Sequence, residues 1–302
     1  MKVLVLSERD VEELLTMERC IEVMAGALSA LARGEVHNPL RQAIRAPGAP
    51  GLLGLMPAWR AGEPAYYALK EVCVFPGNPK RGLDTHLGAV ILHSGDTGEP
   101  LAFMNAAAIT AIRTAAVSAV ATRLLAREDA SVLAIIGKGV QAQSHRRAIP
   151  LVRPIREIRM CGRGESVEEA VRGADVIVTA TNSREPILRR EWVSVGAHIN
   201  AVGSSIAAAR ELEADLVASA SLFVDRREST VNESGDYLAA VEHGAVIRAE
   251  LGELLLGSAE GRKSPGEITL FKSLGLAVED LAAAAFLYET SRREGRGIWI
   301  DF

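Results

Sequence analysis

Apolar residues follow two different rhythms in the first hundred residues. In residues 11–31 they recur every three or four positions, which is typical of one face of a helix, and Ser7 could cap that helix. The short apolar run at 4–7 predicts a strand. From Pro39 to Pro100 the apolar residues gather into the short runs "GLLGLMPAW", "AYYALKEVCVF" and "LGAVILHS", separated by Gly and Pro. These runs predict an antiparallel or mixed sheet.

The pattern changes to alternating helices and strands further along the chain. An alanine-rich helix is expected at about 106–126, followed by the apolar runs "SVLAIIG", "EIRMC", "ADVIVTAT", "AHINAVG" and "LFVD". This alternation is typical of an α/β domain with a parallel sheet. We therefore expect an α+β first domain of residues 1–118 together with 298–302, and an α/β second domain of residues 119–297.

A glycine turn directly follows the first strand of the second domain, in "AIIGKGVQAQSH" at 134–145. Gly137, Gly139 and Ala142 match the pattern G-x-G-x-x-G/A, which allows a tight turn and close approach of the backbone to a pyrophosphate. The following helix would direct its free N–H groups at the phosphates. The turn predicts a dinucleotide site in a Rossmann-type domain, although Lys138 stands where a small residue is usual.

The second crossover of this domain is too short for the usual topology. A β-α-β unit takes about 30 residues, but only the eleven residues "GESVEEAVRGA" separate "EIRMCGR" from "DVIVTA". That length allows one short helix and excludes a helix, a strand and a second helix. Within 162–175, either the lineage has lost an αβ pair or a segment is absent from this chain.

Composition excludes several classes of partner. The net charge of −4 and the pI near 6.0 give no reason to expect nucleic acid or an anionic membrane. Three scattered cysteines and six histidines show no metal-ligand spacing, so no protein metal site is expected. The opening "MKVLVLSERD" is too short an apolar run for a signal peptide. We expect the chain to work in the cytoplasm.

Three cations stand in unusual places. Lys70 lies inside the apolar run "YYALKEVCVF", Arg113 lies in the alanine-rich helix without a carboxylate three or four positions away, and Arg41 follows Pro39 in a loop. Unpaired cations among apolar residues are costly unless an anion meets them, and a small carboxylate substrate would do so. The alternatives are that Lys70 faces solvent from an edge strand and that Arg113 pairs across a domain interface.

Several blocks of the chain resemble the ornithine cyclodeaminase/mu-crystallin family, over about residues 7–297. They are "GLMPAW", "YALKEV", "THLGAVIL", "TGEPLAFMNAAAITAIRTAA", "VLAIIGKGVQA", "HINAVGSS" and "ITLFKSLGLAVEDLAAA". The resemblance implies that the N-terminal domain binds substrate and forms a homodimer, and that a Rossmann domain holds NAD(H) or NADP(H). Members of the family act on amino and imino acids, and mu-crystallin also binds thyroid hormone.

The resemblance also assigns site residues. It implies that Arg41, Lys70 and Arg113 hold the carboxylate of a small amino or imino acid, with Lys70 moving a proton at the reacting nitrogen. A lysine desolvated among cations has a lowered pKa, which suits that role. The positions that match family contacts to the cofactor are Thr85, Gly137, Gly139, Val140, Gln141, Val202, Gly203 and Ser273.

Two departures from ornithine cyclodeaminase narrow the expected reaction. Ser205 and Gly54 stand where that enzyme has the aspartate and glutamate that ornithine needs. We therefore expect an NAD(P)-dependent oxidoreductase of the ketimine reductase or amino-acid dehydrogenase type, acting on a C=N or CH–NH bond. Ornithine cyclodeaminase is the first alternative. A non-catalytic small-ligand-binding protein, to which the shortened crossover would point, is the second.

Arg163 decides the expected form of the cofactor. A site for NAD usually has an acid at the end of the second strand, but "EIRMC" runs into Gly162 and Arg163, and Glu165 falls within the short crossover. A guanidinium at that position could bind a 2′-phosphate. We expect NADP(H) to be preferred over NAD(H), unless Arg163 is only a solvated turn residue.

Overall fold

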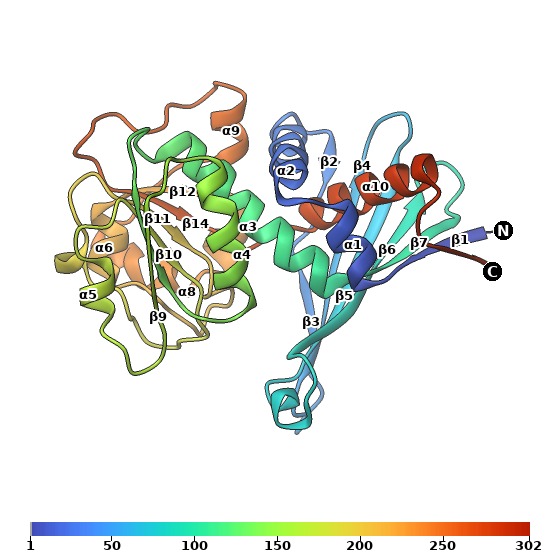
Figure 1. Cartoon of the computed structure of the whole chain (residues 1–302), viewed down its shortest axis with the longest axis horizontal. Coiled ribbons are helices and arrows are strands. Elements are labelled where there is room, and N and C mark those ends of the chain that lie inside the picture. Colours follow the sequence, from blue (N-terminus) through green and yellow to red (C-terminus); the bar gives the residue numbers. More distant parts are fainter. Residues whose placement is uncertain (1) are drawn as a thin grey trace. The chain divides into compact units, whose positions relative to one another are not determined.

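The computed structural model describes residues 2–302, which form two compact units (Figure 1). Unit 1 comprises residues up to 113 together with 276–302, and unit 2 comprises residues 114–275. The first boundary falls inside a single helix, α3 (Ala106–Leu125).

Unit 1 is built on one eight-stranded sheet with the order β15-β1-β7-β6-β5-β4-β2, and β3 pairs with β4. Only β1 and β7 run parallel, so the sheet is mixed as predicted. Its strands are β1 (Lys2–Leu6), β2 (Val36–His37), β3 (Gln42–Ile44), β4 (Leu52–Arg60), β5 (Tyr66–Val74), β6 (His86–Ser94), β7 (Pro100–Asn105) and β15 (Ile298–Asp301).

Helices of unit 1 pack on this sheet. The helices are α1 (Glu8–Leu14), α2 (Met17–Ala32), the start of α3, α10 (Ala277–Glu294) and the 3-10 turn η1 (Asn78–Arg81). Helix α10 packs against α2 and against β4, β5 and β6. The single helix expected from Ser7 to residue 31 is wrong. Leu15 leaves helical backbone angles, and the Thr16 side chain accepts a hydrogen bond from the Arg19 amide, so a second helix begins there.

Unit 2 contains a seven-stranded sheet in which every pairing is parallel, with the order β13-β12-β14-β11-β10-β8-β9. Four expected runs form β8, β9, β10 and β11, and "LFVD" forms most of β12. The strands are β8 (Val132–Ile136), β9 (Glu157–Cys161), β10 (Val176–Thr179), β11 (His198–Ala201), β12 (Ser221–Val224), β13 (Ile247–Glu250) and β14 (Thr269–Lys272).

Helices cover both faces of the unit 2 sheet, as a doubly wound fold requires. One core includes residues of α5, α6 and α8, and the other includes residues of α4 and of the segment just after α3. The helices of this unit are α4 (Val140–Ala148), α5 (Val167–Val171), α6 (Ala214–Ser219), α7 (Arg227–Glu233), α8 (Gly235–Ala240), α9 (Leu251–Leu255), and the 3-10 turns η2 (Ile149–Leu151), η3 (Arg190–Trp192) and η4 (Val241–His243).

The shortened second crossover is confirmed. Between β9 and β10 the chain forms only the five-residue helix α5. In the classic order 3-2-1-4-5-6 the second strand is flanked by the third, whereas β9 is the last strand of its sheet. The fold is therefore a Rossmann-type sheet without the usual third strand.

The domain boundaries differ from the expected ones at the C-terminal side. Residues 276–297 were expected in the nucleotide-binding domain, but they belong to unit 1. The physical reason is that α10 packs on the unit 1 sheet and makes ion pairs with side chains of that unit. The other boundary lies at 113/114, five residues before the expected one.

Candidate functional site

Lys70 occupies the middle of β5, on the side of the sheet that α10 covers. It pairs in register with Met56 and Val90, which are buried, and only 3% of Lys70 is exposed. The interpretation of Lys70 as a solvent-facing lysine on an edge strand is therefore wrong, because β5 lies between β4 and β6.

Two consecutive carboxylates of α10 meet the buried cations. Asp280 lies 2.8 Å from the Lys70 ammonium and accepts from Arg113 Nε at 3.1 Å. Glu279 accepts from the same guanidinium at 2.6 Å. The Lys70 ammonium also donates to the Thr110 hydroxyl at 3.5 Å. All four charged side chains are at least 95% buried, so this is a desolvated charge cluster within unit 1.

The electrostatics of the cluster act directly on Lys70. Burial lowers the pKa of Lys70 to about 8; the charge of Asp280 opposes this shift, and the charges of Arg113 and Arg41 add to it. Arg41 therefore lies close enough to influence the ammonium. The structure thus brings Lys70 and Arg113 together on Asp280, and Arg41 acts on Lys70 through its charge.

Arg113 has acidic partners within the chain, so it is not the unpaired cation that the sequence predicts. The sequence shows no carboxylate near Arg113 along its helix, but Glu279 and Asp280 meet it from 166 and 167 residues away. A substrate is not needed to pair Arg113, and the pairing lies within unit 1 rather than across a domain interface. The signal that could have found these partners is the acidic pair in the otherwise small and apolar run "LAVEDLAAA".

The remaining expected site residue of unit 1, Thr85, lies near one end of β5 and β6. Thr85 directly precedes β6, is half-buried, and accepts through its carbonyl from the Phe75 amide after β5. Beside it, His86 is near enough to Lys70 for that charge to add to the effect of burial, and both lower the pKa of the imidazole.

The glycine turn of unit 2 has the geometry that a dinucleotide needs. Gly137 has a φ of +128°, and a Cβ there would lie 2.5 Å from the Ala180 carbonyl oxygen. Gly139 is different, because a Cβ on it would meet nothing within 4 Å. One glycine is therefore required by the turn itself, and the other leaves open space beside the backbone.

The first turn of α4 faces that space. Its N-cap Gly139 makes no side-chain capping bond, so the first amides of the nine-residue helix have no side-chain cap. Val140 is 67% exposed, and Gln141 follows it half-buried. These residues fit the pyrophosphate of a dinucleotide, since the amides at a helix N-terminus favour an anion.

The end of β9 is more complex than the sequence indicated. Arg163 is exposed there, as expected for a residue that could reach a phosphate. The expectation that no acid lies at this tip is wrong, because the chain folds back and Glu165 accepts from the Gly162 amide at 2.8 Å. Lys138 of the glycine turn lies 2.5 Å from the same carboxylate.

The last three expected cofactor residues follow strands at the carboxyl edge of the unit 2 sheet. Val202 and Gly203 come directly after β11, and Ser273 comes directly after β14. The Ser273 amide donates to the Ala201 carbonyl at 3.0 Å, which holds the two strand ends together. Ligands of doubly wound sheets bind outside this edge, so the fold brings these residues to the expected place within unit 2.

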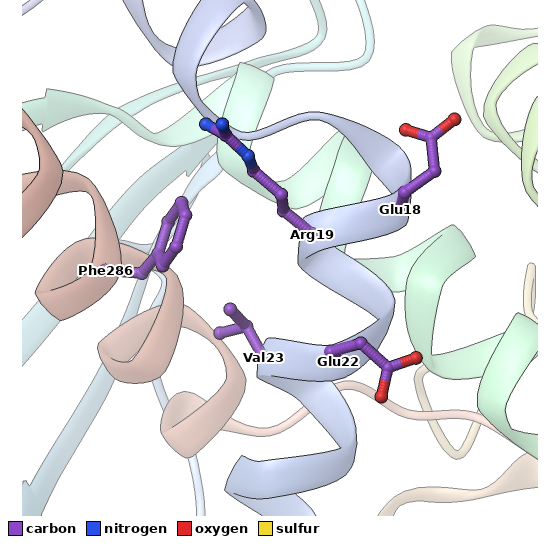
Figure 2. Close-up of a pocket in the computed structure, with 5 residues that line it drawn as sticks. All are labelled: Glu18, Arg19, Glu22, Val23 and Phe286. Carbon is purple, nitrogen blue, oxygen red and sulfur yellow. The ribbon is translucent and has the colours of Figure 1, made fainter.

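Other features of the structure do not add to this site. Among residues 2–302, no three His, Cys, Asp or Glu side chains gather as metal ligands. Helix α3 is long and apolar enough to cross a membrane, but 78% of its apolar window is buried, as in a core helix. A surface groove between α2 and α10 shares no residue with the charge cluster (Figure 2). It is lined by Glu18, Arg19, Glu22, Val23 and Phe286.

Comparison with known proteins agrees with the fold and identifies the family of the chain. The model of the ornithine cyclodeaminase/mu-crystallin family matches residues 1–167 and 164–295, and the two stretches meet in the short connection between β9 and β10. The chain is 40% identical to the ketimine reductase mu-crystallin of Mus musculus over 307 aligned positions, which cover 94% of this chain and 96% of the mouse protein.

Solved structures of similar proteins share the whole architecture. One is the Δ1-pyrroline-2-carboxylate reductase of Thermococcus litoralis in complex with NADH and L-proline, with 37% identity and a TM-score of 0.92 over 98% of this chain and 99% of that one. Another is an archaeal alanine dehydrogenase dimer with bound NAD, with 35% identity and a TM-score of 0.93 over the full length of both chains.

These similarities define a class of two-domain, nucleotide-binding reductases and dehydrogenases of amino and imino acids. This chain belongs to the ornithine cyclodeaminase/mu-crystallin family.

Proposed function

We propose that this chain is an NAD(P)-dependent oxidoreductase that acts on the C=N or CH–NH bond of a small amino acid or cyclic imino acid. The observation that carries the proposal is the buried Lys70, with its lowered pKa and its two neighbouring arginines, in a chain that also has a glycine turn suited to a dinucleotide. When bound, NAD(P)H supplies a hydride to the carbon of the C=N bond.

The cations of this region suit a substrate with a carboxylate. Lys70 and Arg113 are almost fully buried, and the charge of Arg41 also acts on Lys70. In a desolvated site such cations attract a carboxylate more strongly than they would in water. The forked guanidinium groups would orient that carboxylate and so fix the reacting carbon.

Lys70 is the group that moves the proton. With a pKa near 8, its ammonium is present at neutral pH and acidic enough to protonate the developing amine nitrogen. In the direction of oxidation, the neutral amine of Lys70 accepts that proton.

The residues at 54 and 205 speak against ornithine cyclodeaminase, the first alternative. Ornithine cyclodeaminase would need acids where Ser205 and Gly54 stand, and Gly54 contributes no charge to the surrounding strand β4. This favours an apolar or cyclic substrate over a dibasic one. A non-catalytic binding protein is the alternative that the shortened crossover favours.

The deciding experiment supplies pure protein with NADPH or NADH and a panel of cyclic ketimines and 2-keto acids with ammonia, and separately with L-ornithine and NAD. Ketimine-dependent oxidation of the cofactor supports the proposal. Proline formed from ornithine would support cyclodeamination instead, and ligand binding without turnover would support the binding protein.

The variant Lys70→Met tests the role of Lys70. It should lower kcat by roughly 10²–10⁴, the usual contribution of general acid catalysis. An unchanged kcat would remove Lys70 from the mechanism.

We further propose that NADP(H) binds more tightly than NAD(H). Although Glu165 lies at the tip of β9, it is engaged by the Gly162 amide and by Lys138. Arg163 and Lys138 carry two positive charges, and Glu165 carries one negative charge. The remaining positive charge favours a 2′-phosphate over a 2′-hydroxyl.

Cofactor titration by fluorescence tests this preference. The affinity for NADPH should exceed that for NADH at least tenfold, an increment of about 1.4 kcal/mol. Arg163→Ala should remove most of the difference, whereas Glu165→Gln should widen it by removing the negative charge. Equal affinities in the wild type, or a preference for NADH, would contradict the proposal.

We also propose that two copies of the chain form a homodimer in the cytoplasm through the unit 1 sheet. On the face of this sheet opposite to Lys70, cross-strand neighbours form one apolar row, which consists of Pro57, Leu69, Ile91, Phe103, Val5 and Ile298. Each of these side chains is at least partly exposed in the single chain, and Ile298 is 65% exposed. A contiguous apolar row of this kind is typical of an interface, and the archaeal relative is itself a dimer.

A further inference from the structure

Unit 2 contains a second group of buried charges, which the proton chemistry at Lys70 does not use. Glu211 is 0% exposed, and Asp236 and Lys272 are each 1% exposed. Burying charged groups is costly unless they are paired and hydrogen-bonded. The contacts of these three residues therefore indicate their role.

Glu211 joins the carboxyl ends of two neighbouring strands. One carboxylate oxygen accepts from the Thr179 hydroxyl at the end of β10 and from the Gly203 amide after β11, both at 2.7 Å. The other oxygen accepts from the amide and the hydroxyl of Thr181, also at 2.7 Å. Four donors thus converge on one side chain at the edge of the sheet where doubly wound folds bind ligands.

Gly203 is fitted closely into this arrangement. A Cβ on Gly203 would lie 2.1 Å from the Thr181 carbonyl oxygen and 2.5 Å from a Glu211 carboxylate oxygen. The backbone at 203 is therefore fixed by direct contact with Glu211, and its position depends on where that carboxylate is held.

Asp236 binds the backbone at Glu211, and Lys272 pairs with Asp236. One Asp236 oxygen accepts from the backbone amides of Glu211 and Leu212 at 2.8 and 3.0 Å, and the other lies 3.0 Å from the Lys272 ammonium. Burial raises the pKa of Glu211, and the charge of Lys272 opposes this shift. Lys272 is the last residue of β14 and directly precedes Ser273, so the network reaches the third strand end of the same edge.

We propose that Glu211, Asp236 and Lys272 are positioning residues that fix the backbone at Gly203 and Ser273 for the nicotinamide end of the cofactor. The inference rests on the proposed function, because it is the family resemblance that assigns Val202, Gly203 and Ser273 to that end. The pyrophosphate end is held separately by the glycine turn at 137–139. The network should therefore affect one half of the dinucleotide and leave the other half unchanged.

Calorimetric titration with two ligands tests this directly. NADPH contains the nicotinamide, and 2′-phospho-ADP-ribose is the same molecule without it. In Glu211→Gln an amide N–H group replaces one acceptor oxygen, so at least one backbone donor loses its partner. The Kd for NADPH should rise about tenfold, as expected for the loss of one hydrogen bond to a charged acceptor, while the Kd for 2′-phospho-ADP-ribose should change less than about twofold.

A matched control lies at the opposite edge of the same sheet. Asp175 directly precedes β10, accepts from the amides of Ser131 and Val132, and pairs with Arg127. Asp175→Asn should lower the melting temperature without separating the two ligands. If Glu211→Gln folds poorly, Thr179→Val is a milder variant, because it removes only the hydroxyl that donates to Glu211. It should also raise the Kd for NADPH more than the Kd for 2′-phospho-ADP-ribose.

The outcomes separate the inference from the proposed function. Equal weakening of both ligands by Glu211→Gln, or unchanged affinity for both, would overturn the positioning role while leaving the oxidoreductase proposal intact. A wild-type chain that binds neither these two ligands nor NADH would overturn both.

Discussion

Asp280 is the residue on which both buried cations of unit 1 converge. Its carboxylate lies between the Lys70 ammonium and the Arg113 guanidinium, and its charge keeps the pKa of Lys70 from falling further below its ordinary value. Asp280 is thus expected to set the pH range over which the proposed acid works, without touching the substrate.

Asp280→Asn should move the pH dependence of imine reduction. Reduction needs the ammonium form of Lys70, so activity is lost as the pH rises through the pKa of about 8. Removing the negative charge lowers that pKa, and the descending limb of kcat should shift downward by roughly 1 pH unit. Steady-state rates from pH 6 to 10 would measure the shift. A limb that stays in place, or moves upward, would show that Asp280 does not act on Lys70.

Arg113→Ala should separate substrate binding from cofactor binding. We expect the KM for the imino acid to rise at least about tenfold, with the Kd for NADPH unchanged, because the guanidinium is assigned to the substrate carboxylate. The variant should also lose about 3–5 kcal/mol of stability, because Glu279 and Asp280 remain buried without it. Arg113→Lys restores the charge and should recover stability more fully than KM. Weaker cofactor binding with normal KM would contradict the assignment.

At the scale of elements, the strands were easier to predict than the partners of the side chains. Runs such as "YYALKEVCVF" and "SVLAIIG" form β5 and β8 because short apolar stretches between turn residues have few other ways to be buried. Similarly, the eleven residues before "DVIVTA" leave room only for the short helix α5.

What the sequence could not supply depends on contacts between distant residues. Glu279 and Asp280 meet Arg113 only because α10 returns to the first unit. Glu165 lies at the tip of β9 because the chain turns back after Gly162, and the positions of these residues along the sequence do not predict that turn. The break between α1 and α2 also leaves no mark in the apolar pattern, because the periodicity continues across Thr16 while the Thr16 side chain caps a new helix.

The glycine turn before α4 allows a test with an internal control. Gly137→Ala places a Cβ 2.5 Å from a carbonyl oxygen at a φ of +128°, so both stability and cofactor affinity should fall. Gly139→Ala meets open space, so its melting temperature should match the wild type while its affinity for NADPH falls at least about tenfold. Thermal melts and cofactor titrations of the two variants check this. Full cofactor affinity in Gly139→Ala would place the pyrophosphate elsewhere.

For the whole molecule, the apolar row on the unit 1 sheet should control assembly. Ile91→Asp puts a charge in the middle of the row and should convert a dimer into a monomer in sedimentation velocity. Val246→Asp is the matched control, because Val246 is 73% exposed and lies in unit 2, outside the proposed interface. A dimer that persists in Ile91→Asp with an unchanged dissociation constant would rule out this face.

Because the connection between β9 and β10 is short, β9 is an edge strand that other chains in solution can meet. A strand at the end of a sheet presents unpaired amides and carbonyls that a second chain can extend, and such edges promote aggregation. β9 is five residues long, and Arg159 on it bonds both Glu157 and the carbonyl of Arg172. A short edge with charged side chains resists this pairing, although Ile158 remains 38% exposed. Because no third strand flanks it, β9 is an edge that charge, rather than a neighbouring strand, must protect.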